Sequence, residues 1–294
     1  MIVSASYRTD IPAFYGKWFV NRLNAGSCTV ANPYGGPDYQ VSLRPADVDG
    51  FVFWTRNIQP FGDGLRWVEA RAIPFMVQFT ITGYPHALET SVPDADIAVD
   101  QLHRLARAFG PKVAVWRYDP VLITSLTPPD WHVATIARLA ARLAGACDEV
   151  VVSFAHIYRK TRRNLDAAAA KHGFTWCDPD AGDGRALLVR LADAVGEHGM
   201  TLSLCSQPDR LTPGVRPARC IDADRLSQIA GRPIPARRKG NRPGCECHES
   251  RDVGAYDSCP HGCVYCYAVS SKSRASAAVK AHDPLATTLI SRGA

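Results

Sequence analysis

The sequence contains no long hydrophobic run: none of its apolar stretches approaches the roughly 20 residues that a membrane-spanning helix needs. Its first residues lack the basic start and apolar stretch of a secretion signal, and an apolar strand pattern begins at Ile2. No repeat of about 20–50 residues is visible either. We therefore expect a soluble, cytoplasmic protein without a membrane partner, whose ten cysteines lie in a reducing compartment and form no disulfide framework.

Outside residues 210–251, the positive and negative charges of the chain balance. The formal charge is +6, and the stretch 210–251 alone carries ten basic residues against four acidic ones. Such a stretch attracts polyanions such as nucleic acid, or it neutralises anionic metal–thiolate centres. A solvated loop explains the same pattern equally well.

Short apolar strands alternate with amphipathic helices, and a chain of 294 residues that is 46% hydrophobic can bury the core of one large domain. The pattern predicts strands at 2–6, 50–54, 75–82, 113–117, 149–154, 201–205 and, more weakly, 253–256. It predicts helices at 13–23, 96–108, 130–143, 185–198 and 223–229. Repeated strand–helix units indicate an α/β fold with a parallel, TIM-type barrel, complete or partial. We expect residues 1–230 to form the barrel body and residues 231–294, a basic loop and a cysteine-rich segment, to close the same domain.

Polar side chains follow most of the predicted strands. In a parallel barrel the carboxyl ends of the strands share one rim, where active sites are built. The candidate catalytic residues at this rim are Arg8, Asp10, Arg56, Arg117 and Asp119. Each also has a structural interpretation, since Asp10 is placed to cap a helix and Arg117 with Asp119 can form a buried ion pair.

Near the C-terminus, the cysteine loop (residues 259–266) carries Cys259, Cys263 and Cys266 at C-x3-C-x2-C spacing. A four-iron cluster needs one ligand for each iron, so three cysteines leave one iron open for an exogenous molecule. Structural zinc is a weaker interpretation because it usually takes four ligands from paired C-x2-4-C arms, and only Cys263 and Cys266 have that spacing. Unligated thiols are a third interpretation.

Four further cysteines form what we call the second cysteine group: Cys205, Cys220, Cys245 and Cys247. They can close a separate site, either an iron–sulfur cluster or a zinc held by four thiolates. Alternatively, one of them is the fourth ligand of the first cluster, which would then be a closed electron carrier. The remaining cysteines, Cys28, Cys147 and Cys177, are isolated in sequence and are expected to be core or surface residues.

The string Cys259-Pro260-His261-Gly262-Cys263-Val264-Tyr265-Cys266 resembles the signature loop of the radical S-adenosylmethionine superfamily, most of all in spore-photoproduct-lyase-like proteins. In that superfamily the loop usually follows the first barrel strand, whereas here it follows the last, as a circular permutation of the barrel would place it. The longer pattern of 8–12, 53–55, 116–120 and the terminal cysteines also resembles an uncharacterised bacterial family known only as a domain of unknown function.

The resemblance implies a cofactor and a reaction. S-adenosylmethionine would bind the open iron of a [4Fe–4S] cluster, and an electron from a donor such as a flavodoxin or ferredoxin would release a 5′-deoxyadenosyl radical. That radical would take hydrogen from an anionic small molecule or a nucleic-acid substrate held by Arg8, Arg56, Arg117 and the residues after the strand at 149–154. The Gly-Gly-Glu strand typical of the superfamily is missing, so Asp10 or Asn57 would help to bind the cofactor. Tyr265 or Tyr267 would shield the cluster or stack on adenine, and His261 would point to solvent.

Two other classes of function compete with this one. The first is a non-catalytic electron-transfer protein with closed iron–sulfur clusters. The second is a zinc-stabilised nucleic-acid-binding protein that uses Arg237, Arg238 and Lys239.

Overall fold

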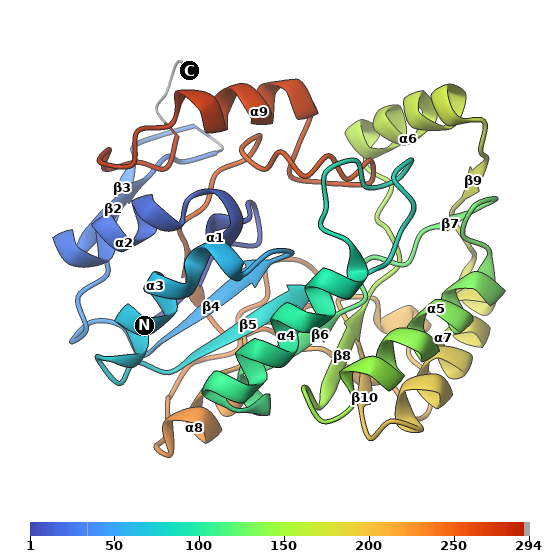
Figure 1. The fold of residues 1–294 in the computed structure, drawn as a ribbon, viewed down its shortest axis with the longest axis horizontal. Helices are drawn as coiled ribbons and strands as arrows, with labels where there is room; N and C mark the ends of the chain where they lie inside the picture. Colours follow the sequence, from blue (N-terminus) through green and yellow to red (C-terminus); the bar gives the residue numbers. More distant parts are fainter. Residues whose placement is uncertain (34, 291–294) are drawn as a thin grey trace.

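The structure, a computed structural model, describes residues 1–33 and 35–290. It is an α/β fold built on one sheet of eight parallel strands, in the order β11-β10-β8-β6-β5-β4-β1-β12 (Figure 1). These strands are β1 (Ile2–Ala5), β4 (Gly50–Thr55), β5 (Phe75–Thr80), β6 (Ala114–Arg117), β8 (Glu149–Val152), β10 (Thr201–Leu204), β11 (Arg216–Pro217) and β12 (Ser250–Asp252). Two antiparallel pairs lie outside it, β2 (Ser27–Val30) with β3 (Tyr39–Ser42) and β7 (Ile123–Thr124) with β9 (Trp176–Cys177).

The helices alternate with the strands of the sheet, as the sequence predicts. They are α1 (Ile11–Phe14), α2 (Gly16–Ala25), α3 (Gly62–Glu69), α4 (Ala95–Phe109), α5 (Pro129–Leu143), α6 (Arg159–His172), α7 (Ala181–Gly196), α8 (Ala223–Ala230) and α9 (Lys272–Ala281). Short 3-10 turns lie at η1 (Gln59–Phe61), η2 (Pro111–Val113) and η3 (Pro208–Arg210). Within the described part of the chain, no helix combines the length and the apolar character that crossing a membrane requires.

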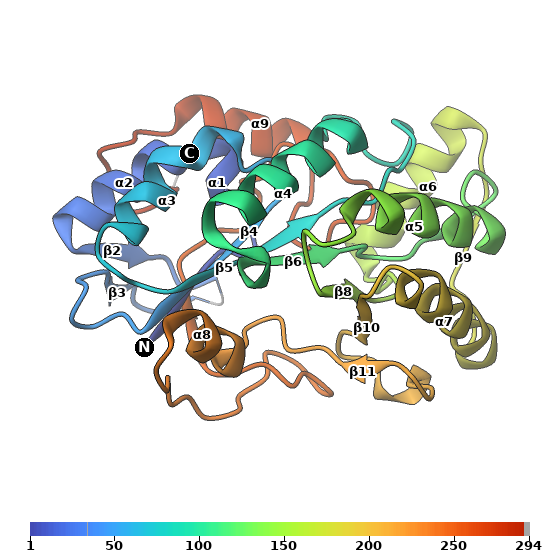
Figure 2. The ribbon, with the colours of Figure 1, turned by 60° about the horizontal axis from the view of Figure 1, so that its bottom comes forward.

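The two faces of the sheet are covered differently. Every second strand residue, such as Phe53, Phe79 and Trp116, is buried in the large core beneath the outer helices. The intervening residues, such as Val52 and Val115, pack in a smaller core against α8 and the cysteines of the second group. Figure 2 shows α8 and the chain after it on the side of the sheet opposite α3, α4 and α5. The polar side chains farther along these strands therefore point toward the α8 side.

Six predicted strands are confirmed, with ends that differ by a few residues. The seventh is displaced: β12 lies at Ser250–Asp252 instead of 253–256, and it pairs in parallel with β1. Its residues are Ser, Arg and Asp, and it lies at the edge of the sheet, so hydrophobic alternation could not locate it. The helices α3, α6 and α9 were not predicted; α6 has a strongly polar surface and α9 buries only Ala275.

The C-terminal segment packs against the start of the chain. Trp18 Nε1 donates to Ala286 O at 2.9 Å, and Asn21 Nδ2 donates to Pro284 O at 2.9 Å. Tyr15 Oη donates to Ser258 O at 2.6 Å, directly before the cysteine loop. The segments before and after the cysteine loop therefore both contact the residues that follow β1, and these contacts place the loop near the carboxyl end of that strand.

Candidate functional site

The cysteine loop lies at the carboxyl ends of β1, β4 and β5, against the segment that follows β5. Val264 N donates to Leu88 O at 3.0 Å, and Ser91 N donates to His261 O at 2.9 Å. Cys263 forms an antiparallel bridge with Glu89. These backbone contacts at His261, Cys263 and Val264 attach the middle of the loop to the segment after β5.

The three cysteines of the loop line one pocket of about 200 Å³. Its other walls come from α6 and the start of α9 and include Asn164, Ala167, Ser271 and Lys272. Burial raises the pKa of the Cys263 thiol to about 12, with negative charge on Glu89 adding to the rise and Arg56 opposing it. Burial likewise raises the pKa of Cys259, and negative charge on Asp10 and on the other two thiols adds to it. Three thiolates gathered here therefore need positive charge among them.

Beneath the loop lies a buried ion pair. Arg56, directly after β4, approaches Glu89 at 3.0 Å between Nη2 and Oε1, and the same Nη2 donates to Tyr265 Oη at 2.6 Å. Tyr265 donates in turn to Glu89. Thr82 Oγ1 adds a bond to Glu89 Oε1 at 2.8 Å. Arg56 and Glu89 are 8% and 3% exposed, so this network fixes Tyr265, and with it the loop, to the sheet.

Asp10 joins the same site from the end of β1. Its Oδ1 accepts from Ala13 N at 2.9 Å and caps α1, while its Oδ2 accepts from Arg56 N at 2.8 Å. The same Oδ2 lies 2.9 Å from Nε2 of His261, whose Nδ1 lies 3.1 Å from Ser91 O. His261 is 4% exposed, and the expectation that it points to solvent is wrong. Asp10 therefore caps a helix and also holds the loop.

Arg8 lies elsewhere, in a network centred on Asp252 of β12. The Asp252 carboxylate accepts from Arg8 Nε at 2.9 Å, Ser6 Oγ at 2.7 Å and Ser4 Oγ at 2.8 Å. It also accepts from the backbone N–H groups of residues 7 and 254. Because this carboxylate ties β1 to β12 and engages the Arg8 guanidinium, Arg8 is a structural ion-pair partner in this arrangement.

Two residues predicted to bind the cofactor serve local structure. The Asn57 side chain accepts from Gln59 N at 3.3 Å at the turn into η1. Tyr267 donates to Tyr7 O at 2.5 Å, so its ring lies toward the β1 end and not over the pocket. Of the two predicted tyrosines, Tyr265 alone is buried beside the loop cysteines.

Arg117 and Asp119 lie on the α8 side of the sheet. They form an ion pair at 2.6 Å between Nη2 and Oδ2, and Ser153 Oγ donates to the other oxygen of Asp119 at 2.5 Å. Arg117 Nη1 points to Cys220 Sγ at 3.0 Å, and its guanidinium lies over the Trp54 ring at 5.0 Å. The prediction that Arg8, Asp10, Arg56 and Arg117 face the cysteine loop together thus holds for Asp10 and Arg56 only, because the other two pair with carboxylates elsewhere.

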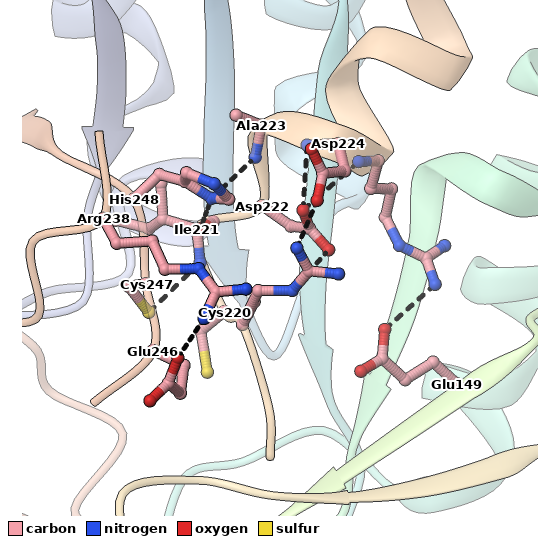
Figure 3. A network of polar contacts seen from close by, with 12 residues as sticks. Glu149, Cys220, Ile221, Asp222, Ala223, Asp224, Arg238, Glu246, Cys247 and His248 are labelled. Atoms are coloured by element: carbon pink, nitrogen blue, oxygen red, sulfur yellow. Dashed lines mark hydrogen bonds and ion pairs between the residues drawn. The ribbon is translucent and has the colours of Figure 1, made fainter. Parts of the chain in front are cut away.

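The second cysteine group is also assembled from distant parts of the chain. Cys205 Sγ and Cys220 Sγ lie 3.6 Å apart, Cys220 also contacts Cys247, and Cys247 contacts Cys245. Figure 3 shows Cys220 and Cys247 side by side, with Ile221 N donating to Cys247 Sγ at 3.4 Å. None of these four cysteines is among the residues that line the pocket of the cysteine loop, so the two sets of cysteines are separate.

Sequence reasoning missed three side chains of the site: Glu89, His261 as a buried group, and Lys272. Glu89 is a lone acid in a loop, and Lys272 opens an unpredicted helix, where its Nζ donates to Thr90 Oγ1 and Ser91 Oγ at 2.7 Å each. The one available signal was Thr82, the last residue of the strand predicted at 75–82, whose hydroxyl donates to Glu89 at 2.8 Å.

The comparisons with known proteins place the chain in a family. No curated protein and no solved structure matches it. No match to a radical S-adenosylmethionine family was found, so that resemblance rests on the cysteine loop. The family model described as "Domain of unknown function (DUF1848)" matches residues 2–268, a range that includes both sets of cysteines. The chain therefore belongs to the DUF1848 family.

Proposed function

We propose that the protein is an iron–sulfur enzyme of the radical S-adenosylmethionine type, with a [4Fe–4S] cluster bound by Cys259, Cys263 and Cys266. The observation that carries the proposal is the convergence of these three cysteines on one pocket at the carboxyl ends of a parallel sheet. Thiolates are the ligands that iron–sulfur clusters take, and strand ends of this kind are where α/β enzymes bind their reactants.

The pocket supports an open iron because its lining offers no fourth cysteine. Its remaining candidate ligand among the described residues is His261, and both ring nitrogens of His261 already have hydrogen-bond partners in Asp10 and Ser91. A volume of about 200 Å³ is below the roughly 300–1,000 Å³ of small-molecule sites, so it suits a compact inorganic group. S-adenosylmethionine would then bind on the open side of that group.

When bound, the cluster and S-adenosylmethionine together supply a 5′-deoxyadenosyl radical that removes a hydrogen atom from a substrate. The residues of the chain supply positioning and charge. Arg56 brings a buried cation next to Cys263 and Cys259, which offsets their negative charge. Lys272 lines the pocket as a second cation and is available to a carboxylate. The backbone bonds of the loop keep the three sulfurs in place throughout.

The topology supports the finer proposal of a partial, circularly permuted barrel. Seven of the eight strands lie in sequence order, and β12 lies beside β1. A loop that follows β12 therefore reaches the rim next to the loop that follows β1, where the superfamily usually carries its cysteines. The substrate would be anionic, and the electron would come from a donor of the flavodoxin or ferredoxin type in a reducing cytoplasm.

The alternative of nucleic-acid binding through the basic loop is weakened by ion pairing. Arg237 and Lys239 both pair with Glu249, at 2.5 Å and 2.9 Å. Arg238 pairs with Glu246 at 2.6 Å. These exposed pairs add little stability, but they neutralise much of the positive charge that a phosphate backbone would need.

The experiment is anaerobic reconstitution with iron and sulfide, followed by electron paramagnetic resonance with and without S-adenosylmethionine. We expect a reduced-cluster signal that changes when S-adenosylmethionine is added, and that is lost when Cys259, Cys263 and Cys266 are all replaced by Ala. Replacing Cys28 and Cys147, which are buried outside both groups, is the matched control and should leave the signal unchanged. A cluster signal that ignores S-adenosylmethionine would favour an electron carrier, and a signal that survives the triple replacement would refute the ligand set.

A further inference from the structure

We propose that the second cysteine group, Cys205, Cys220, Cys245 and Cys247, is a closed metal centre with four thiolate ligands. It is a different site from the pocket of the cysteine loop, and the proposal stands whether or not that loop binds a cluster. The metal is one that thiolates select, either zinc or the iron of an iron–sulfur cluster.

The first observation is the convergence of the sulfurs. Cys205 ends β10, Cys220 follows β11, and the other two cysteines lie in the loop before β12. The Sγ atoms of Cys205 and Cys220 are 3.6 Å apart. Two sulfurs bound to one zinc at about 2.3 Å lie about 3.8 Å apart, so this pair already has the spacing of a shared metal. Contacts between sulfurs thus join four of the ten cysteines, although these four come from three separate segments.

The second observation is the charge around them. Arg117 Nη1 points to Cys220 Sγ at 3.0 Å, and Arg242 Nη2 points to Cys205 Sγ at 3.5 Å. Arg117 is 6% exposed, and Asp119 is its single carboxylate partner among the ion pairs of the described residues. A neutral thiol is a weak acceptor, whereas a thiolate accepts charge-assisted hydrogen bonds. Two guanidinium groups directed at two sulfurs therefore indicate a site built to hold negative charge, which four thiolates on a divalent metal retain.

The third observation is the rigid support of the site. His248 N donates to Ile221 O at 3.0 Å, and Ala223 N donates to His248 Nδ1 at 3.1 Å (Figure 3). Gln78 Nε2 from β5 donates to Cys220 O at 2.9 Å. Figure 3 shows that this network joins the segment after Cys220 to the segment after Cys247. Cys220 and Cys247 are thus fixed ligands on the buried α8 side of the sheet.

The contacts run in series from Cys205 through Cys220 and Cys247 to Cys245. In residues 1–33 and 35–290, no three Cys, His, Asp or Glu side chains surround one point as a single ion requires. Metal binding must therefore draw the ends of this series together. Cys205, Cys220 and Cys247 are buried and Cys245 is half-buried on a loop, so completing the site requires a shift of the loop that carries Cys245.

The test uses the full chain, purified anaerobically, with Cys259, Cys263 and Cys266 replaced by Ala to remove the other candidate site. We expect this loop variant to retain either about one zinc, or about four irons with matching acid-labile sulfide, per chain. Further replacement of Cys220 and Cys247 by Ala should remove that metal. Replacing Cys28 and Cys147 instead, as the control, should leave it. A loop variant without bound zinc or iron, also after incubation with zinc chloride, would overturn the proposal.

A second measurement does not require the replacement of Cys220 and Cys247. X-ray absorption at the zinc or iron edge of the loop variant should show a shell of sulfur ligands at about 2.3 Å and no light-atom ligands. A shell of nitrogen or oxygen would place the metal elsewhere and contradict the proposal. If the loop variant loses its response to S-adenosylmethionine but keeps this sulfur shell, the two sites are independent.

Discussion

Replacing Glu89 by Gln should strongly destabilise the protein. The change preserves the shape of the side chain and leaves the Arg56 guanidinium, which is 8% exposed, without its carboxylate. Removing one partner of a buried ion pair typically costs about 3–5 kcal/mol, because the other charge stays desolvated and unpaired. Tyr265 and Thr82 also lose a charged acceptor, so we expect a value in this range.

The assay is thermal or urea unfolding of the metal-free protein, followed by circular dichroism. At about 2 °C per kcal/mol for a chain of this size, the midpoint should fall by roughly 6–10 °C. Glu246→Gln is the matched control, because Glu246 pairs with Arg238 at 2.6 Å on the surface. Exposed pairs contribute little, so the control should change stability by less than about 1 kcal/mol.

A double-mutant cycle tests the cause. Arg56→Met combined with Glu89→Gln removes both charges, so the double variant should lose less stability than the two single variants added together. If Glu89→Gln costs no more than Glu246→Gln, or if the two changes are simply additive, the pair does not hold the cysteine loop as we describe.

Two further predictions concern other buried groups. Asp252→Asn should lower the free energy of unfolding, measured in urea, by about 3–5 kcal/mol, because it places an amide among five hydrogen-bond donors and leaves Arg8 without its carboxylate. A loss below about 1 kcal/mol would show that β12 is held by its backbone alone. Burial lowers the pKa of His132 to about 4, below the roughly 6.5 of an unfolded chain, so the unfolded state binds the extra proton between these values. The contribution of His132 to the free energy of unfolding should therefore be fully present above about pH 6.5 and should fall by roughly 3 kcal/mol as the pH drops toward 4. His132→Gln should flatten this part of the plot of stability against pH. An unchanged slope would contradict the prediction.

The fold was largely predictable from the sequence. The strands β4, β5 and β8 carry apolar residues on both faces, as parallel strands covered on both sides require. The periodicity of helices such as α4 and α5 agrees with their buried residues. The helix α6 was not predicted because its surface is basic and polar. The strand β12 was not located because an edge strand of Ser, Arg and Asp has no hydrophobic pattern.

The part of the candidate site whose residues are close in sequence, the three cysteines of the loop, could be predicted. The ion pairs between residues far apart in sequence could not. Nothing local indicates that Arg8 pairs with Asp252, 244 residues later, or that His261 is buried against Asp10. Glu89 was equally unpredictable, because its role depends on contacts with Arg56 and Tyr265, which lie far from it in the sequence. A buried charge takes its partner from whatever the packing brings near, and packing joins residues that the sequence separates.

By itself the sequence determined the alternation of strands and helices and the three-cysteine spacing of the loop, because hydrophobic periodicity and short ligand spacings are local properties. The tertiary structure alone decided which polar strand ends face that loop, and it directed Asp10 and Arg56 there while Arg117 turned to the second cysteine group. It also gathered Cys205, Cys220, Cys245 and Cys247, which come from three separate segments. The physical reason is that a buried charge takes the partner that packing brings near: Arg56 and Arg117 lie at the ends of strands on the two sides of β5, but Arg56 meets Glu89 and Arg117 meets Asp119.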